Sequence, residues 1–180
     1  MTPLRTERLI LRNWRAGDRD LFRRINADDQ VMEFFPFRRS VEEADAFLER
    51  LIAENEAVGY GWAAAEIADT GETIGFIGIH AAEIEPIVPS GSIEIGWRLA
   101  PEFWGRGYVT EGARAWLGFA FDVLKVPEVL SFAVETNVRS IAVMQRLGMQ
   151  RVGSFDHPAV PDTHPDLRRH VLYRISAPGT

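Results

Sequence analysis

The chain has 180 residues, 46% hydrophobic and 11% aromatic, which suits one α/β domain over residues 1–180 better than two domains. It contains no cysteine, which excludes disulfide scaffolds, thiolate metal sites and a cysteine nucleophile. The 26 acidic and 20 basic residues give a net charge of −6, which disfavours nucleic acids and anionic membranes as partners and is compatible with a cationic substrate.

The N-terminal segment 1–14 has arginines that interrupt every apolar run. It therefore lacks the hydrophobic stretch of a secretory signal, and it falls short of the roughly 18–20 apolar residues that span a membrane. We expect a cytoplasmic protein.

The N-terminal part predicts a strand followed by two helices. Residues 9–14 alternate weakly, as in a strand, and Asp18 can then cap a helix. Ser40 and Glu43 have the spacing of a capping box ahead of an apolar stripe, so the second helix is expected to begin at Ser40. An aromatic loop, residues 32–37, separates the two helices.

The rest of the chain predicts an antiparallel hairpin and then alternating helices and strands. A strand over 92–99 would place Glu94 and Arg98 on one face. A long amphipathic helix follows residue 108 and is expected to end near Pro127. The other predicted elements are strands at 61–67, 73–80, 129–135, 149–155 and 169–175 and a helix at 137–147. Together these elements describe an α/β fold with a mixed, mostly antiparallel central sheet flanked by helices.

The segment Trp104-Gly105-Arg106-Gly107-Tyr108-Val109-Thr110-Glu111 lies between a strand and the start of the long helix. Two glycines let the backbone approach a ligand closely, and the free N–H groups at a helix start suit a diphosphate. Taken alone, the same residues are interpreted more simply as a tight strand-to-helix turn.

This segment occurs together with Glu94-Ile95-Gly96-Trp97 before it and with Asn137-Val138-Arg139-Ser140 and Leu147-Gly148-Met149 after it. In this order the motifs resemble those of the GNAT superfamily of N-acetyltransferases. The opening segment Thr6–Arg12 resembles the first strand of its Rim-type branch, which acetylates the N-termini of ribosomal proteins. The resemblance covers nearly the whole chain and implies a single-domain GNAT-like fold with acetyl-coenzyme A as cosubstrate and no metal.

The resemblance also implies where the coenzyme lies. Backbone groups of Trp97, Arg98 and Leu99 would pair with the pantetheine arm, and Asn137 and Ser140 would lie beside the thioester. The diphosphate would bind to Trp104, Gly105, Arg106, Gly107, Tyr108, Val109 and Thr110. The sequence departs from the common pattern at Glu102, Val109 and Met149, but none of these changes removes a backbone donor.

A more serious departure concerns the leaving thiolate. Met144 occupies the position where many members of the superfamily place a tyrosine that protonates the thiolate, and a thioether cannot donate a proton. In the Rim-type branch a serine at the position of Ser140 has been proposed for this role, so Ser140 is the candidate general acid. The alternative is that Ser140 only positions the ligand.

An amine must be neutral to attack a thioester, whereas an alkylammonium group is mostly protonated at neutral pH. Glu94 is the best-placed candidate base, acting through a water molecule. The alternative is a structural ion pair between Glu94 and Arg98 on the same strand face. Glu135 is a weaker candidate and reads more simply as a solvent-facing charge.

The histidines, the aromatic loop and two adjacent arginines are assigned structural or surface roles. The four histidines lack a two-histidine spacing on one face, so no zinc site is predicted, although His157 could touch substrate. Phe34, Phe35 and Phe37 are expected to pack in the core rather than form a substrate wall, although the resemblance places the acceptor groove near this loop. Arg38 and Arg39 are expected to be solvated charges.

Three functions remain open at this point. The first is acetyl transfer to the α-amine of a protein or peptide, the second is acetyl transfer to a small amine, and the third is an acyl-coenzyme A-binding module with little catalysis. In either transfer reaction the acetyl group is expected to pass directly to the amine, because cysteine is absent and no serine–histidine pair is evident. The oligomeric state is left open, with a homodimer as one option.

Overall fold

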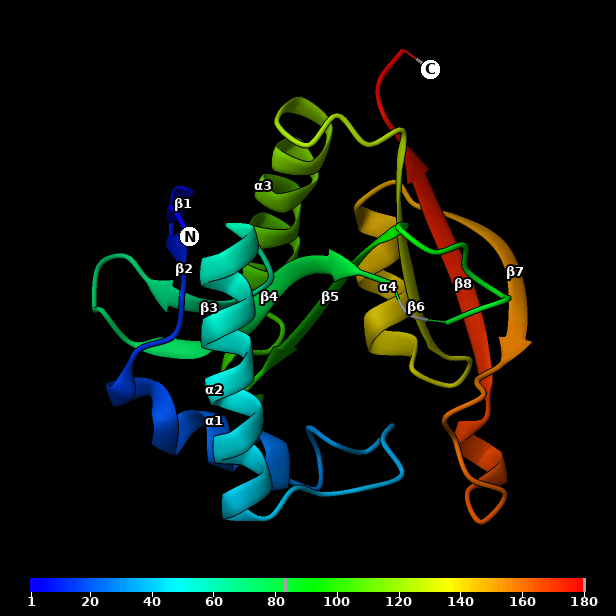
Figure 1. Ribbon diagram of the computed structural model, residues 1–180, viewed down its shortest axis with the longest axis horizontal. Coiled ribbons are helices and arrows are strands. Elements are labelled where there is room, and N and C mark those ends of the chain that lie inside the picture. The colour runs from blue at the N-terminus through cyan, green and yellow to red at the C-terminus, as the bar shows by residue number, and fades with distance from the viewer. Residues whose placement is uncertain (83, 180) are drawn as a thin grey trace.

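The computed structural model describes residues 1–82 and 84–179, and within these ranges eight strands form one sheet in the order β1-β2-β3-β4-β5-β6-β8-β7 (Figure 1). Neighbouring strands are antiparallel except for β5 and β6, which are parallel, so the predicted mixed sheet is confirmed. The strands are β1 (Leu4–Arg5), β2 (Leu9–Arg12), β3 (Trp62–Ile67), β4 (Thr73–Ala81), β5 (Ile93–Leu99), β6 (Glu128–Val134), β7 (Gln150–Asp156) and β8 (Arg169–Ser176).

Helices cover both faces of the sheet (Figure 1). The helices α1 and α2 cover one face, where Phe22 of α1 packs edge to face against Trp14 with ring centroids 4.9 Å apart. On the other face, the Trp116 indole of α3 donates a hydrogen bond to the Ile77 carbonyl at 2.9 Å, which fixes α3 across β4. The four α-helices of the described residues are α1 (Arg19–Ala27), α2 (Val41–Val58), α3 (Tyr108–Asp122) and α4 (Val138–Arg146).

The start of α2 lies where the capping-box spacing predicted it. Ser40 accepts a hydrogen bond from the Glu43 N–H at 3.2 Å, and the Glu43 carboxylate accepts the Ser40 N–H at 2.8 Å. This reciprocal pair satisfies two N–H groups that the helix start would otherwise leave unpaired.

Three expectations about element ends are wrong. Asp18 lies at the N-cap position of α1, but its carboxylate makes no capping bond there and instead binds Arg12 and the Arg15 N–H. The helix predicted to run to about Pro127 ends at Asp122, and Lys125 then turns the chain with a φ of 56°. The strand predicted over residues 9–14 ends at Arg12. This strand pairs with β1, which the sequence did not indicate.

The parallel pair β5 and β6 creates the opening that positions the site. The two strands are in register only at Glu94 and Leu130, whereas β5 stays paired with β4 along its whole length. Beyond Glu94, the β6-facing backbone groups of β5 therefore have no strand partner. The sheet is split between these two strands, and the split connects its two faces.

Within the described residues, no helix is long and apolar enough to cross a membrane.

Candidate active site

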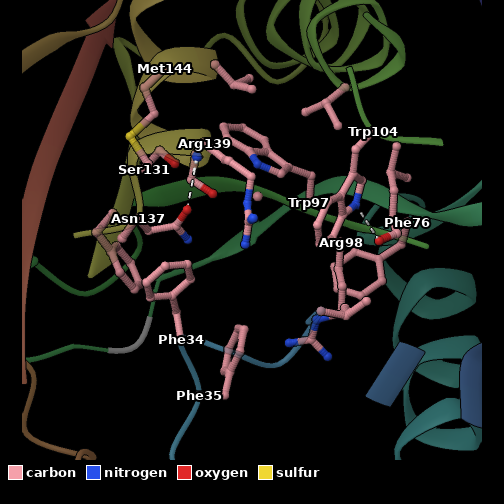
Figure 2. Close-up of a pocket in the computed structure, with 18 of the residues that line it drawn as sticks. Phe34, Phe35, Phe76, Trp97, Arg98, Trp104, Ser131, Asn137, Arg139 and Met144 are labelled. Carbon is pink, nitrogen blue, oxygen red and sulfur yellow. Dashed lines mark hydrogen bonds between the residues drawn. The ribbon is translucent and has the colours of Figure 1, made fainter. Parts of the chain in front are cut away.

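A cavity of about 1490 Å³ occupies the split between β5 and β6 (Figure 2). It exceeds the roughly 300–1,000 Å³ of a typical small-ligand pocket, so it has room for a large cofactor and an acceptor together. One part is lined by the start of α3 and by α4. The other part lies on the α1 and α2 side, between β5 and the aromatic loop 32–37.

The loop before α3 has the backbone shape that a diphosphate requires. Gly105 and Gly107 have φ angles of 72° and 81°, which residues with a Cβ rarely adopt. Gly107 is the N-cap of α3 and offers no side chain, so the first N–H groups of this helix are left for another partner. A helix start with free N–H groups is a ready-made anion site.

The N-terminal segment holds this loop in place. Glu111 in the first turn of α3 accepts hydrogen bonds from the Thr6 hydroxyl at 2.6 Å and from the Arg8 backbone N–H at 2.7 Å. The Arg8 guanidinium also binds Glu111 at 2.6 Å and donates to the Arg106 carbonyl at 2.9 Å. The opening motif of the sequence thus anchors the glycine loop.

Most of the predicted coenzyme residues border the cavity, and Arg106 is the exception, with its guanidinium 5.6 Å from the centre of the Phe103 ring. The Trp104 indole donates to the Leu99 carbonyl at 2.8 Å, which ties the loop to the end of β5. The predicted residues that line the cavity are Glu94, Trp97, Arg98, Leu99, Trp104, Gly105, Gly107, Tyr108, Val109, Thr110, Asn137 and Ser140.

The start of α4 contributes a hydroxyl and a capping amide to the cavity. Asn137 Oδ1 accepts the Ser140 N–H at 3.1 Å, so the Asn137 oxygen is engaged as a cap. The Ser140 hydroxyl makes no side-chain hydrogen bond to any described residue and lines the cavity. Met144 is buried one turn further on, and beside it lies Ser131 of β6, a second cavity hydroxyl that the sequence reasoning missed (Figure 2).

Glu94 is a buried carboxylate with one polar neighbour. Its side chain is 13% exposed and lies 3.2 Å from His80 Nε2, directly across the strand pair β4 and β5. Burial raises the pKa of Glu94 above its ordinary value, although the interaction with His80 opposes this shift. A carboxylate with a raised pKa, facing a cavity, can accept a proton near neutral pH.

The structural alternative for Glu94, an ion pair with Arg98, is wrong. Arg98 instead donates to Asn26 Oδ1 at 2.7 Å. Four residues of strand separate the two Cα atoms by about 13 Å, too far for the side chains to pair along the strand. The predicted placement of Glu94 and Arg98 on one face holds, and Gly96 lies between them, where the Trp62 ring occupies the space that a side chain would need.

The expectations for the aromatic loop and for Arg39 are also wrong. Phe34, Phe35 and Phe37 line the cavity, and Phe35 and Phe37 are 37% and 41% exposed. Arg39 is not a solvated charge, because its guanidinium lies between Phe37 and Phe47, 4.8 Å and 4.5 Å from the ring centres. Arg38 is the exposed neighbour and pairs with Asp29.

The remaining candidate residues lie either at the cavity or on the surface. His157 lines the cavity, and its ring centre lies 4.8 Å from that of His170, which stacks on Phe155. Burial lowers the pKa of both histidines. Glu135 pairs with Arg151 at 2.8 Å on the surface, as expected. Among the described residues no cluster of three or more metal-ligating side chains occurs.

A split sheet with an uncapped helix start on one face and a largely buried carboxylate on the other fits a two-substrate transferase. The family model for the acetyltransferase (GNAT) domain matches residues 8–150. The chain belongs to the GNAT family of acetyltransferases, enzymes that use acetyl-coenzyme A as the acyl donor. The expected class of enzyme, an acetyl-coenzyme A-dependent N-acetyltransferase, is confirmed.

Among its relatives is the FsC-acetyl coenzyme A-N(2)-transacetylase of Aspergillus fumigatus, 31% identical over 160 residues. That match covers 84% of this chain and 66% of the relative. The ribosomal-protein-S5-alanine acetyltransferase of Vibrio fischeri has the same fold, with a TM-score of 0.76, 14% identity and coverage of 99% and 98%. The spermidine N-acetyltransferase of Vibrio cholerae, solved with CoA and spermine, has a TM-score of 0.73, 19% identity and coverage of 95% and 96%.

The glycine loop yields a prediction for coenzyme binding. In Gly107→Val, a β-branched side chain would occupy a left-handed conformation, at a cost of about 1–2 kcal/mol, and its Cβ would meet the Arg8 guanidinium. We expect coenzyme A affinity, measured by calorimetry, to fall by at least about tenfold. Arg106→Ala is the matched control and should change affinity little. Wild-type affinity in the valine variant would contradict the assignment of this loop.

Proposed function

We propose that the protein transfers the acetyl group of acetyl-coenzyme A directly to a primary amine that enters from the α1 and α2 side. The observation that carries this proposal is the buried carboxylate of Glu94 in the same cavity as the glycine loop before α3. Residues 1–180 would act as one domain, since one continuous sheet contains both the first and the last strand.

The coenzyme would lie in the split of the sheet. The N–H groups from Gly105 to Thr110 would hold its diphosphate, and the backbone of Trp97, Arg98 and Leu99 would pair with its pantetheine arm. Both assignments are supported by the positive φ angles of the loop and by the unpaired edge of β5. The thioester would then lie between β5 and the start of α4, beside Asn137.

Glu94 would accept the proton that the amine loses, through a water molecule, as the amine nitrogen bonds to the thioester carbonyl carbon. The carbon–sulfur bond then breaks, and the coenzyme A thiolate leaves and takes up a proton. Ser140 is the proposed donor, because its hydroxyl lines the cavity and has no side-chain partner among the described residues. Ser131 is the nearby alternative, and Met144 cannot serve.

Ser140→Ala should slow the reaction moderately. Coenzyme A is a fairly good leaving group, so protonation of its thiolate helps the reaction without being required. We expect kcat to fall by about tenfold, less than the usual 10²–10⁴-fold contribution of a general acid or base. Steady-state kinetics of thiol release measure this effect, and Val138→Ala, at an exposed position of the same helix, is the control. An unchanged kcat would leave Ser140 with a positioning role only.

The acceptor is proposed to be a primary amine, either the α-amine of a protein or peptide N-terminus or an amine of a small molecule. The first option is supported by the opening motif Thr6–Arg12 and by the fold shared with the Vibrio fischeri enzyme. A panel assay of coenzyme A release, with peptides and small amines as acceptors, tests the proposal. Acceptor-dependent release would support it, and release that no amine accelerates would contradict it.

A further inference from the structure

Two arginines of the acceptor side have no carboxylate partner among the described residues. Arg98 extends from β5 and finds one hydrogen-bond acceptor, the neutral amide oxygen of Asn26. Arg39, just before α2, forms no ion pair, and its Nε is buried without any hydrogen-bond partner. Most other arginines pair with carboxylates, even exposed ones such as Arg38 with Asp29 and Arg168 with Asp162.

Aromatic rings hold both guanidinium groups in place. The Arg98 guanidinium lies 4.4 Å from the centre of the Phe35 ring and 5.3 Å from that of Phe76, and Figure 2 shows it between the aromatic loop and β5. Arg39 is similarly held between Phe37 and Phe47. Ring faces fix a planar guanidinium but accept none of its in-plane N–H groups, so the terminal N–H groups of Arg39, and those of Arg98 that do not bind Asn26, remain available at the cavity wall.

Neither guanidinium forms an ion pair with a described residue. Burial lowers the pKa of Arg98 to about 9, and the positive charge of Arg39 adds to this shift. Burial also lowers the pKa of Arg39, and the charge of Arg50 contributes to that effect, whereas the charge of Glu43 opposes it. A partly buried cation is costly unless an anion pairs with it, so a bound anion would be stabilised here.

We propose that the amine acceptor also carries a carboxylate, which binds to Arg39 and Arg98 while the amine faces Glu94. The proposal rests on the proposed function, because it places the acceptor in the same cavity. Phe34, Phe35 and Phe76 give the acceptor an apolar wall. A polycation such as spermine, found with the Vibrio cholerae relative, would meet two guanidinium groups in this part of the cavity.

Matched acceptors that differ only in the carboxylate test this inference. We expect kcat/KM for phenylalanine to exceed that for phenylalaninamide by about 10–100-fold, the effect of one or two hydrogen bonds to a charged group. The amide has the less basic amine, so the comparison is biased against the proposal. The dipeptide amides Ala-Asp amide and Ala-Asn amide form a second pair, which differs only in the side-chain carboxylate because both C-termini are blocked. This pair distinguishes a free amino acid from a peptide with an acidic side chain as the source of the carboxylate.

Arg39→Gln should reduce the ratio of kcat/KM for acid to that for amide to about twofold or less, mainly through the KM of the acid. Arg38→Gln is the matched control, because it removes the adjacent but exposed arginine and should keep the ratio. An acid-to-amide ratio of kcat/KM that Arg39→Gln leaves unchanged would overturn the proposal while acetyl transfer itself stood.

If no amine in the panel is acetylated, that result counts against the proposed function. A binding measurement then tests the carboxylate site separately. Tryptophan fluorescence of the wild-type protein with coenzyme A can follow titration with N-acetylphenylalanine and with its amide. The proposal requires tighter binding of the acid by about tenfold or more. Equal binding of the two compounds would overturn it independently of catalysis.

Discussion

We expect Glu94→Gln to lower kcat by roughly 10²–10⁴-fold, the usual contribution of a positioned proton acceptor. Glutamine keeps the shape of glutamate and can still hydrogen-bond to His80, but it cannot accept the proton of the attacking amine. Coenzyme affinity should remain near that of the wild type, because Glu94 lies on the acceptor face of β5. Steady-state kinetics with a verified acceptor, combined with calorimetry for coenzyme A, separate the two effects.

The pH dependence sharpens this expectation. As the proposed base, Glu94 would act only as a carboxylate, so wild-type activity should fall as the pH drops through its pKa, which burial raises above the ordinary value. Glu94→Gln should lack this acidic limb. Its deficit should also shrink as the pH rises, because more of the acceptor amine is then already neutral.

The matched control is Glu135→Gln, which removes an exposed carboxylate paired with Arg151 outside the cavity. It should retain nearly full activity at every pH. Near-normal turnover of Glu94→Gln across the pH range would show that Glu94 is not the base and that its contact with His80 is structural.

Arg12→Leu should destabilise the fold by about 3–5 kcal/mol, the usual cost of leaving buried carboxylates without their cation. The Arg12 side chain is 4% exposed and binds Asp18 at 2.7 Å and Glu66 at 2.6 Å. It also donates a hydrogen bond to the Thr73 hydroxyl oxygen at 2.9 Å. Leucine fills part of the volume but leaves two carboxylates in a buried site.

Denaturant unfolding measures this effect as a shift in midpoint at constant slope. Arg168→Leu is the control, because it removes an exposed ion pair with Asp162 and should change stability by less than about 1 kcal/mol. A loss below 1 kcal/mol in Arg12→Leu would mean that Asp18 and Glu66 are satisfied by other groups.

Local signals predicted the elements well. The capping box at Ser40 marked the start of α2 correctly, and alternation marked β5. The misplaced end of α3 has a local cause, since Leu124 continues the apolar period although the chain has already left the helix. The pair of residues in β1 is too short to show a period and depends on pairing with β2.

In the candidate site, too, features set by neighbouring residues were predictable and features set by distant residues were not. The shape of the glycine loop was predictable because it depends on consecutive residues, two of which are glycines with positive φ angles. The contact of Glu94 with His80 depends on the register between β4 and β5, which are joined by a long connection whose length sets no register. The unpaired Arg39 and Arg98 are 59 positions apart in sequence, and only the folded chain places them in one cavity. The net charge of −6 gave no indication of this local positive charge.

The central claim, direct transfer within one cavity that passes through the sheet, is tested most directly by a rapid-quench experiment with labelled acetyl-coenzyme A. Mass spectrometry of the quenched protein and product analysis follow the acetyl group through a single turnover. Direct transfer predicts that label passes from coenzyme A to the amine without appearing on the protein, and that little thiol is released when the amine is absent. An acetylated protein that forms and decays fast enough to account for turnover would contradict it.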